Sequence, residues 1–192
     1  EILLWKDNEK KRDLILITSD AQSLTPKGIY KISNFLAKCL HQFGVKLVVA
    51  LGAYPVNKQA LNTRLPKIYI TSTSKELLES YLKKNKFEKL QKGVIIGANG
   101  LIPTLAKARF NIDGLVLLAE TDNIAMINED ITDLKASMAL LEILQQSFNL
   151  PIKHYSMENI DEMSKNLESK KNKLEKDLES FQFIDTAEEK RK

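Results

Sequence analysis

GVIIGANGLIPTLAKARFNIDGLVLLAETD, residues 93–122, reads as a strand, a glycine turn, a helix and a second strand. The short apolar run at 93–96 leads into the turn Gly97-Ala-Asn-Gly100, after which apolar residues recur at helical spacing. The nearly continuous apolar run at 113–119 is typical of a strand buried on both faces of a parallel sheet. This stretch therefore predicts an α/β fold.

Strands and helices alternate along the rest of the first 150 residues. Further strands are predicted at 13–18, 45–51 and 67–71, a loop at 53–66, and helices at 26–43, 76–84 and 131–148. The helix at 26–43 carries apolar residues at spacings of three and four, which make it amphipathic: Ile29, Ile32, Phe35, Leu36, Cys39, Leu40 and Phe43. Thr25-Pro26 begins this helix and Gly44 ends it, while Thr73 and Glu76 form a predicted capping box for the next one.

This alternation predicts a three-layer α/β/α body with a mostly parallel sheet over residues 1–150. From 151 to 192 aromatic residues thin out and charged residues dominate, so this segment is predicted to be a charged C-terminal helical extension. Its apolar residues lie at heptad-like spacing and suit docking on the body or on another subunit. The candidate interaction face consists of Ile160, Met163, Leu167 and Leu174, and the apolar face of the helix at 131–148 is a further candidate contact.

Composition narrows the classes of function. The chain has 192 residues, 43% of them hydrophobic and 28% charged, with a net charge of +4 and no dense basic block, so neither nucleic acid nor a membrane is an expected partner. The single cysteine, Cys39, excludes an internal disulfide and a cysteine-rich zinc site. Because the sequence lacks an initiator Met and starts at Glu1, almost within a strand, we expect that residues upstream have been removed or are not part of this sequence.

Polar residues at predicted strand ends suggest a cleft, because ligands bind at the carboxyl edge of open parallel sheets. The candidate cleft residues are Asp20, Gly52, Gly97, Asn99, Gly100, Glu120 and Thr121. The glycine turn is neither GxGxxG nor a P-loop, and a turn requirement explains it better than phosphate binding. His41 and His154 are isolated, and no nucleophile elbow is present. The sequence thus predicts no catalytic residue, no metal site and no cofactor.

Four segments together resemble the proteasome assembly chaperone family in its archaeal branch. They are DLILITSDAQ from Asp13, GVKLVVALGAY from Gly44, VIIGANGL from Val94 and IDGLVLLAET from Ile112. Such proteins are similar to the second subunit of the eukaryotic proteasome assembly chaperone heterodimer. The resemblance covers roughly residues 13 to 150, and the charged tail also suits this family.

The resemblance implies a three-layer α/β/α body, small homo-oligomers, a cytoplasmic location and no enzymatic activity. Some archaeal members bind the α-ring of the proteasome through a C-terminal hydrophobic–tyrosine–any tripeptide, whereas this sequence ends in Lys190-Arg-Lys192. The expected function is therefore a homo-oligomeric, chaperone-like or proteasome-binding protein, with proteasome α subunits as partner. Two alternatives stay open: a small-molecule or nucleotide-binding α/β enzyme that uses the cleft, and an orphan oligomeric scaffold.

Overall fold

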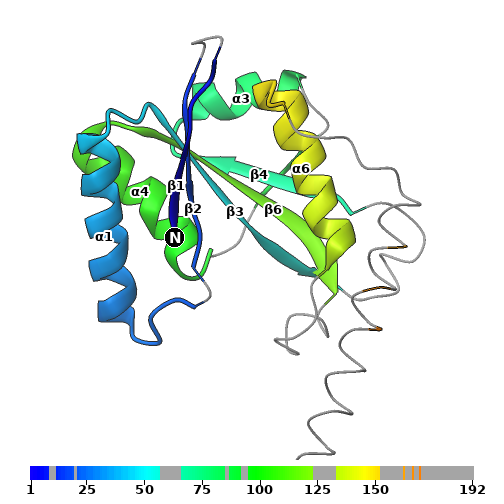
Figure 1. Cartoon of the computed structure of the whole chain (residues 1–192), viewed down its shortest axis with the longest axis horizontal. Helices are drawn as coiled ribbons and strands as arrows, with labels where there is room; N and C mark the ends of the chain where they lie inside the picture. The colour runs from blue at the N-terminus through cyan, green and yellow to red at the C-terminus, as the bar shows by residue number, and fades with distance from the viewer. Residues whose placement is uncertain are drawn as a thin grey trace, which may run out of the picture. The chain divides into compact units, whose positions relative to one another are not determined.

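The computed structural model describes residues 1–8, 12–19, 21–56, 66–84, 87–91, 95–122 and 133–151, together with 162, 166 and 169. The fold is a mixed α/β fold in which helices flank a central sheet, so the predicted α/β class is confirmed (Figure 1). The chain forms two compact units. Unit 1 comprises Glu1–Gly52, Ile70–Lys83 and Glu88–Leu117; unit 2 comprises Ala53–Tyr69, Lys84–Phe87 and Leu118–Lys192.

Within the described residues, the strands form two sheets. The first pairs β1 with β2, and the second has the strand order β3-β6-β4-β5. In chain order the elements are β1 (Ile2–Trp5), β2 (Leu14–Ile17), α1 (Pro26–Gln42), β3 (Leu47–Val56), β4 (Ile68–Ser72), α3 (Lys75–Lys84), β5 (Glu88–Lys89), α4 (Ala98–Phe110), β6 (Asp113–Asp122) and α6 (Leu134–Phe148). The predicted boundary at residue 150 stays a prediction, because almost all of the tail lies outside the described residues.

Strands β4 and β6 run antiparallel. The Glu120 amide donates to the Lys67 carbonyl oxygen at 3.0 Å, and the Thr73 amide donates to the Gly114 carbonyl oxygen at 2.9 Å. Residue numbers thus rise along one strand while they fall along the other. The expectation of a mostly parallel sheet is wrong for this pair. An apolar run indicates burial on both faces, and β6 is buried at every position from 114 to 121 although its neighbour β4 is antiparallel.

The segment at 13–18 forms a strand, but it belongs to a hairpin. Strand β2 pairs antiparallel with β1, with Ile2 opposite Ile17 and Trp5 opposite Leu14. The expectation that this segment joins the larger sheet is therefore wrong. The predicted strand at 93–96 is also wrong where it is described. Ile95 and Ile96 are not in a strand, and Ile96 is largely exposed.

Helices α1 and α4 lie side by side in unit 1 (Figure 1). Their shared core contains Ala37, Leu105, Ala106 and Ile112, and Val45, Val48 and Phe110 pack against it. Both predicted ends of α1 are confirmed. The Gly28 amide donates to the Thr25 side-chain oxygen at 3.1 Å, and Gly44 follows the last turn with φ of 71°.

The start of α3 differs from the predicted capping box. Ser74, rather than Thr73, accepts the hydrogen bond from the Leu77 amide, at 3.3 Å. The Thr73 hydroxyl instead accepts from the Gly114 amide at 2.9 Å, which ties the end of β4 to the start of β6. A side chain in a strand–helix connection can serve either neighbour, and the sequence does not show which one is within reach.

Gly114 allows α4 to approach β6 closely. A Cβ atom at this position would lie 2.4 Å from Pro103 Cβ and 3.1 Å from Pro103 Cα. The proline ring is rigid and Pro103 lies within α4, so the helix itself would have to shift. Gly114→Ala is expected to lower the free energy of unfolding by about 1–3 kcal/mol, as measured by chemical denaturation.

The control for this prediction is Gly44→Asn. A Cβ atom at Gly44 would have no other atom within 4 Å, and asparagine tolerates the positive φ of this position. A change of less than about 0.5 kcal/mol is therefore expected. A Gly114→Ala protein as stable as the unchanged protein would contradict the close contact between Gly114 and Pro103.

Candidate functional site

Three predicted cleft residues, Gly97, Asn99 and Gly100, lie at the start of α4. Gly97 precedes the helix with φ of 91° and offers no side chain to cap it. The Gln22 side-chain oxygen instead accepts from the Ala98 amide at 3.3 Å. The Asn99 side-chain amide donates to the Leu51 carbonyl oxygen at 2.9 Å. The polar groups of this turn therefore connect α4 to other segments of unit 1.

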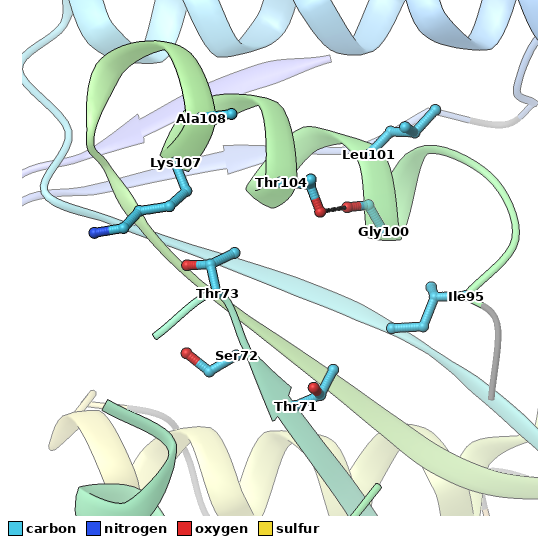
Figure 2. Close-up of a pocket in the computed structure, with 9 residues that line it drawn as sticks. All are labelled: Thr71, Ser72, Thr73, Ile95, Gly100, Leu101, Thr104, Lys107 and Ala108. Atoms are coloured by element: carbon cyan, nitrogen blue, oxygen red, sulfur yellow. Dashed lines mark hydrogen bonds between the residues drawn. The ribbon is translucent and has the colours of Figure 1, made fainter. Parts of the chain in front are cut away.

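A pocket of about 560 Å³ lies between α4 and the end of β4 (Figure 2). It is lined by residues of both segments and of the loop before α4: Thr71, Ser72, Thr73, Ile95, Gly100, Leu101, Thr104, Lys107 and Ala108. Of the predicted cleft residues, Gly100 is among them. The lining combines hydroxyl groups, the ammonium group of Lys107 and apolar side chains.

Most polar groups of this pocket already have partners within the protein. The Ser72 hydroxyl donates to the Gly114 carbonyl oxygen at 2.9 Å, and the Thr104 hydroxyl donates to the Gly100 carbonyl oxygen at 2.7 Å. Lys107 Nζ lies 2.8 Å from Asp113 Oδ1 and donates to Asn111 Oδ1 at 2.8 Å. A ligand would have to compete with these contacts, so the arrangement favours a structural role for the pocket.

Glu120 and Thr121 belong to unit 2 and are buried there, with exposed fractions of 2% and 4%. The Glu120 carboxylate accepts from the Lys67 amide at 2.9 Å and from the Tyr69 hydroxyl at 3.2 Å. The Tyr69 ring packs against Tyr54, with ring centroids 4.4 Å apart. This carboxylate therefore anchors the start of β4 to β6.

Thr121 has a related structural contact. Its hydroxyl donates to Asp133 Oδ2 at 2.7 Å, while Asp133 Oδ1 accepts from the Ala136 amide at 2.9 Å and caps α6. Gly52, the remaining described cleft residue, is half-buried within β3. Asp20 and the four candidate tail residues, Ile160, Met163, Leu167 and Leu174, lie outside the described residues.

Two features are absent from the part of the chain that the structure describes: a cluster of metal-binding residues and a helix that could span a membrane. No group of three or more His, Cys, Asp and Glu residues is placed there to hold a metal ion. No helix among those same residues combines the length and the apolar character that a membrane span requires.

Sequence reasoning missed a cluster of exposed apolar side chains on the β1–β2 hairpin. We call it the hairpin patch, and its members are 36–60% exposed: Ile2, Leu3, Leu4, Trp5, Leu16 and Ile17. Soluble proteins rarely expose so many neighbouring large apolar side chains unless the surface binds something. The signal in the sequence is that both segments are apolar at every position, so neither face of the hairpin is polar.

Helix α1 carries a second exposed apolar surface. Ser33, Ala37 and Leu40 are buried, whereas Ile32, Phe35 and Phe43 are 53–63% exposed. We call these three exposed residues the α1 stripe. The sequence hint was the width of the apolar face, since the seven apolar residues of this helix exceed what one neighbouring helix covers.

Relatives of this chain exist among known protein families and curated proteins. The sequence model of the PAC2 family matches residues 1–175. A curated relative, the uncharacterized protein MJ1210 of Methanocaldococcus jannaschii, is 27% identical over 165 residues, which are 86% of this chain. The chain spans 59% of the length of that relative.

Solved structures resemble this fold closely. PbaB of Pyrococcus furiosus, an archaeal proteasome activator, is 26% identical with a TM-score of 0.70, covering 91% of this chain and 70% of its own. PbaA of the same organism, an archaeal homolog of proteasome-assembly chaperone, is 17% identical with a TM-score of 0.65 over 93% of this chain and 67% of its own. A Thermoplasma acidophilum protein of unknown function is 22% identical with a TM-score of 0.65, covering 94% and 67%. The last two similarities concern the fold alone.

Proposed function

Because this chain belongs to the PAC2 family, we propose that it is a non-enzymatic, chaperone-like protein that assembles with copies of itself and binds proteasome α subunits. In this proposal, the protein acts in the cytoplasm. The observation that carries the proposal is the grouping of exposed apolar side chains on the hairpin patch and the α1 stripe. The description of PbaB as a proteasome activator supports the choice of partner.

The hydrogen bonds of the candidate cleft residues favour a protein-binding function over an enzyme that uses the cleft. Glu120, Thr121 and Asn99 each make hydrogen bonds within the protein. Groups that act on a substrate need free lone pairs or protons aimed into a cavity. The large apolar side chains, by contrast, are the ones that remain in contact with water.

The α1 stripe is the surface that we assign to the α subunit. Lys27, Lys31 and Lys38 are exposed on the same helix, so the stripe has a charged border on one side. An apolar centre with a polar border is typical of contacts between proteins that also exist apart. The tail residues Ile160, Met163, Leu167 and Leu174 remain a proposed additional contact, which truncation of the tail would test.

The proposed function predicts two changes in solution mass. Alone, the protein is expected to have the mass of a defined homo-oligomer. Mixed with proteasome α subunits, unassembled or assembled, it is expected to form a heavier species that contains both proteins. Native mass spectrometry, or light scattering coupled to gel filtration, measures both changes.

Each result has a different consequence. A monomer that ignores α subunits would contradict the whole proposal. A defined oligomer that ignores them would remove the proteasome as partner and favour the orphan scaffold. An unrelated α/β protein of similar size and charge, mixed with the same subunits, controls for unspecific association.

A further inference from the structure

The exposed lysines of α1 form a row along one face of the helix. Lys27, Lys31 and Lys38 are separated by four and seven residues, and this spacing places their side chains on the same side of an α-helix. We call these three residues the lysine row. Phe35 lies four residues after Lys31 and three residues before Lys38, so the α1 stripe adjoins the row along its length.

Helices α1 and α4, which pack against each other, carry positive charge only. Neither helix contains an Asp or Glu residue. On the side of the row away from Phe35, the exposed Arg109 of α4 donates a hydrogen bond to the Tyr30 hydroxyl at 3.0 Å. Within the residues that the structure describes, no ion pair joins the lysine row to a carboxylate, whereas Lys107 pairs with Asp113. The row therefore presents ammonium groups that this part of the fold does not neutralise.

The lysine row lowers the stability of α1 instead of raising it. Lys27 lies in the first turn, where the positive end of the helix dipole disfavours a cation. Lys27 and Lys31 are four residues apart, and like charges at this spacing repel. Acidic residues at the same spacing would offset this repulsion, but α1 has none. Because sequences tend to break such local rules where function requires it, a binding role accounts for the row better than a role in folding.

Charge complementarity identifies the chemistry of a suitable partner. Carboxylates of another molecule would give the lysine row the opposite charges that α1 and α4 lack. The α1 stripe beside it requires apolar side chains on the partner. A segment with acidic residues on one side and aliphatic residues on the other meets both requirements. A nucleic-acid backbone could lie along the row, but it offers no aliphatic side chain to pack against Ile32.

We infer that the lysine row and the α1 stripe together bind an acidic, amphipathic protein segment, whose carboxylates lie along the row and whose apolar side chains cover the stripe. This inference rests on the proposed function, which places that segment on the proteasome α subunit, and it names the chemistry of the partner. Because the lysines are exposed, salt screens the attraction. Binding should therefore weaken as the salt concentration rises.

The test reverses two charges of the row in the full chain by combining Lys31→Glu with Lys38→Glu. At about 0.05 M salt this double variant is expected to bind α subunits at least about tenfold more weakly than the unchanged protein. At about 0.5 M salt the difference should fall below about threefold. Titration of labelled α subunit at both salt concentrations gives the dissociation constants.

Thermal melting separates this binding role from a structural one. Lys31→Glu alone removes the like-charge pair with Lys27 and introduces an attractive one, so this variant should melt no lower than the unchanged protein. Weaker binding without a loss of stability is the expected result. If the two lysines served the fold, their replacement would lower the melting temperature as well.

Lys83→Glu combined with Lys89→Glu is the matched control. Both lysines are exposed, and they lie in α3 and in β5, so the net charge changes equally while α1 and α4 stay unchanged. Binding of α subunits should stay within about threefold of the unchanged protein, since only long-range attraction is altered. Equal weakening in the two double variants would overturn the inference, because total charge would then govern binding. Unchanged binding in the row variant would also overturn it, and would leave the proposed partner in place.

Two probes distinguish a failure of this inference from a failure of the proposed partner. One is a short labelled peptide with glutamate and leucine on opposite faces of a helix, and the other is a single-stranded oligonucleotide of equal charge. Tighter binding of the peptide, lost in the row variant, would support the inference even if α subunits did not bind. Tighter binding of the oligonucleotide would overturn it and assign the row to nucleic acid. A protein that binds neither α subunits nor the peptide would contradict both proposals.

Discussion

Replacing Glu120 with alanine is expected to lower the free energy of unfolding by about 3 kcal/mol. The side chain is 2% exposed, and its carboxylate accepts hydrogen bonds from the Lys67 amide and the Tyr69 hydroxyl. Truncation removes the acceptor of both bonds and leaves a cavity between β4 and β6. Removal of a buried carboxylate also relieves a desolvation cost, but alanine supplies no group that could receive the two donors. Urea denaturation followed by circular dichroism measures the loss.

Two variants make this prediction specific. Glu120→Gln keeps the size of the side chain and one acceptor oxygen, so it should lose less, about 1 kcal/mol. Glu142→Ala removes an exposed carboxylate on α6 whose partner is Gln146, and a change within about 0.5 kcal/mol is expected. If Glu120→Ala were as stable as Glu142→Ala, the carboxylate would not hold β4 and β6 together. The ligand-binding role that its strand-end position suggested would then remain a candidate for Glu120.

Local signals in the sequence predicted the helices well. Thr25, Pro26 and Gly44 define the ends of α1 through contacts within a few residues, and those contacts are present. The strand at Asp113–Asp122 is equally clear, because a long apolar run must be buried. Such features depend on neighbours in the chain, so one sequence contains the information they need.

Strand direction and exposure could not be predicted in the same way. Residues 114–121 of β6 are buried at every position, so both faces of the strand are covered, and such burial occurs with parallel and antiparallel neighbours alike. The run at 14–17 is equally apolar, yet it forms an exposed hairpin. Apolar character shows that a segment will be covered. It does not show whether the cover is the same chain or another one.

The candidate cleft illustrates a related limit. Glu120 stands at a strand end, as a ligand-binding carboxylate would, but its partners Lys67 and Tyr69 are more than fifty residues away in sequence. No pattern in the sequence around Glu120 shows that these two hydrogen-bond donors lie next to it in the fold. The role of Gly97, Asn99 and Gly100 as a ligand site stays a prediction, because their contacts within the protein do not test ligand binding.

Phe35→Lys is expected to weaken binding to proteasome α subunits by about thirtyfold or more, provided that the α1 stripe is the contact. Phe35 is 62% exposed in the middle of the stripe, where Ile32 and Phe43 flank it. Burial of an aromatic side chain at the centre of an interface often supplies a large share of the binding energy. A lysine at that position would have to lose its hydration without gaining a partner. Titration of labelled α subunit with the variant gives the dissociation constant.

Ile96→Lys separates a specific contact from a general effect of added charge. Ile96 is 85% exposed and lies in the loop before α4, away from the residues of the stripe in sequence, so binding should stay within about twofold of the unchanged protein. Phe35→Lys should also keep its oligomeric mass if the α1 stripe contacts only the α subunit. Unchanged α-subunit binding in Phe35→Lys would exclude the stripe as the contact and direct attention to the tail. Loss of the oligomer in this variant would show that α1 contacts a second copy of the chain.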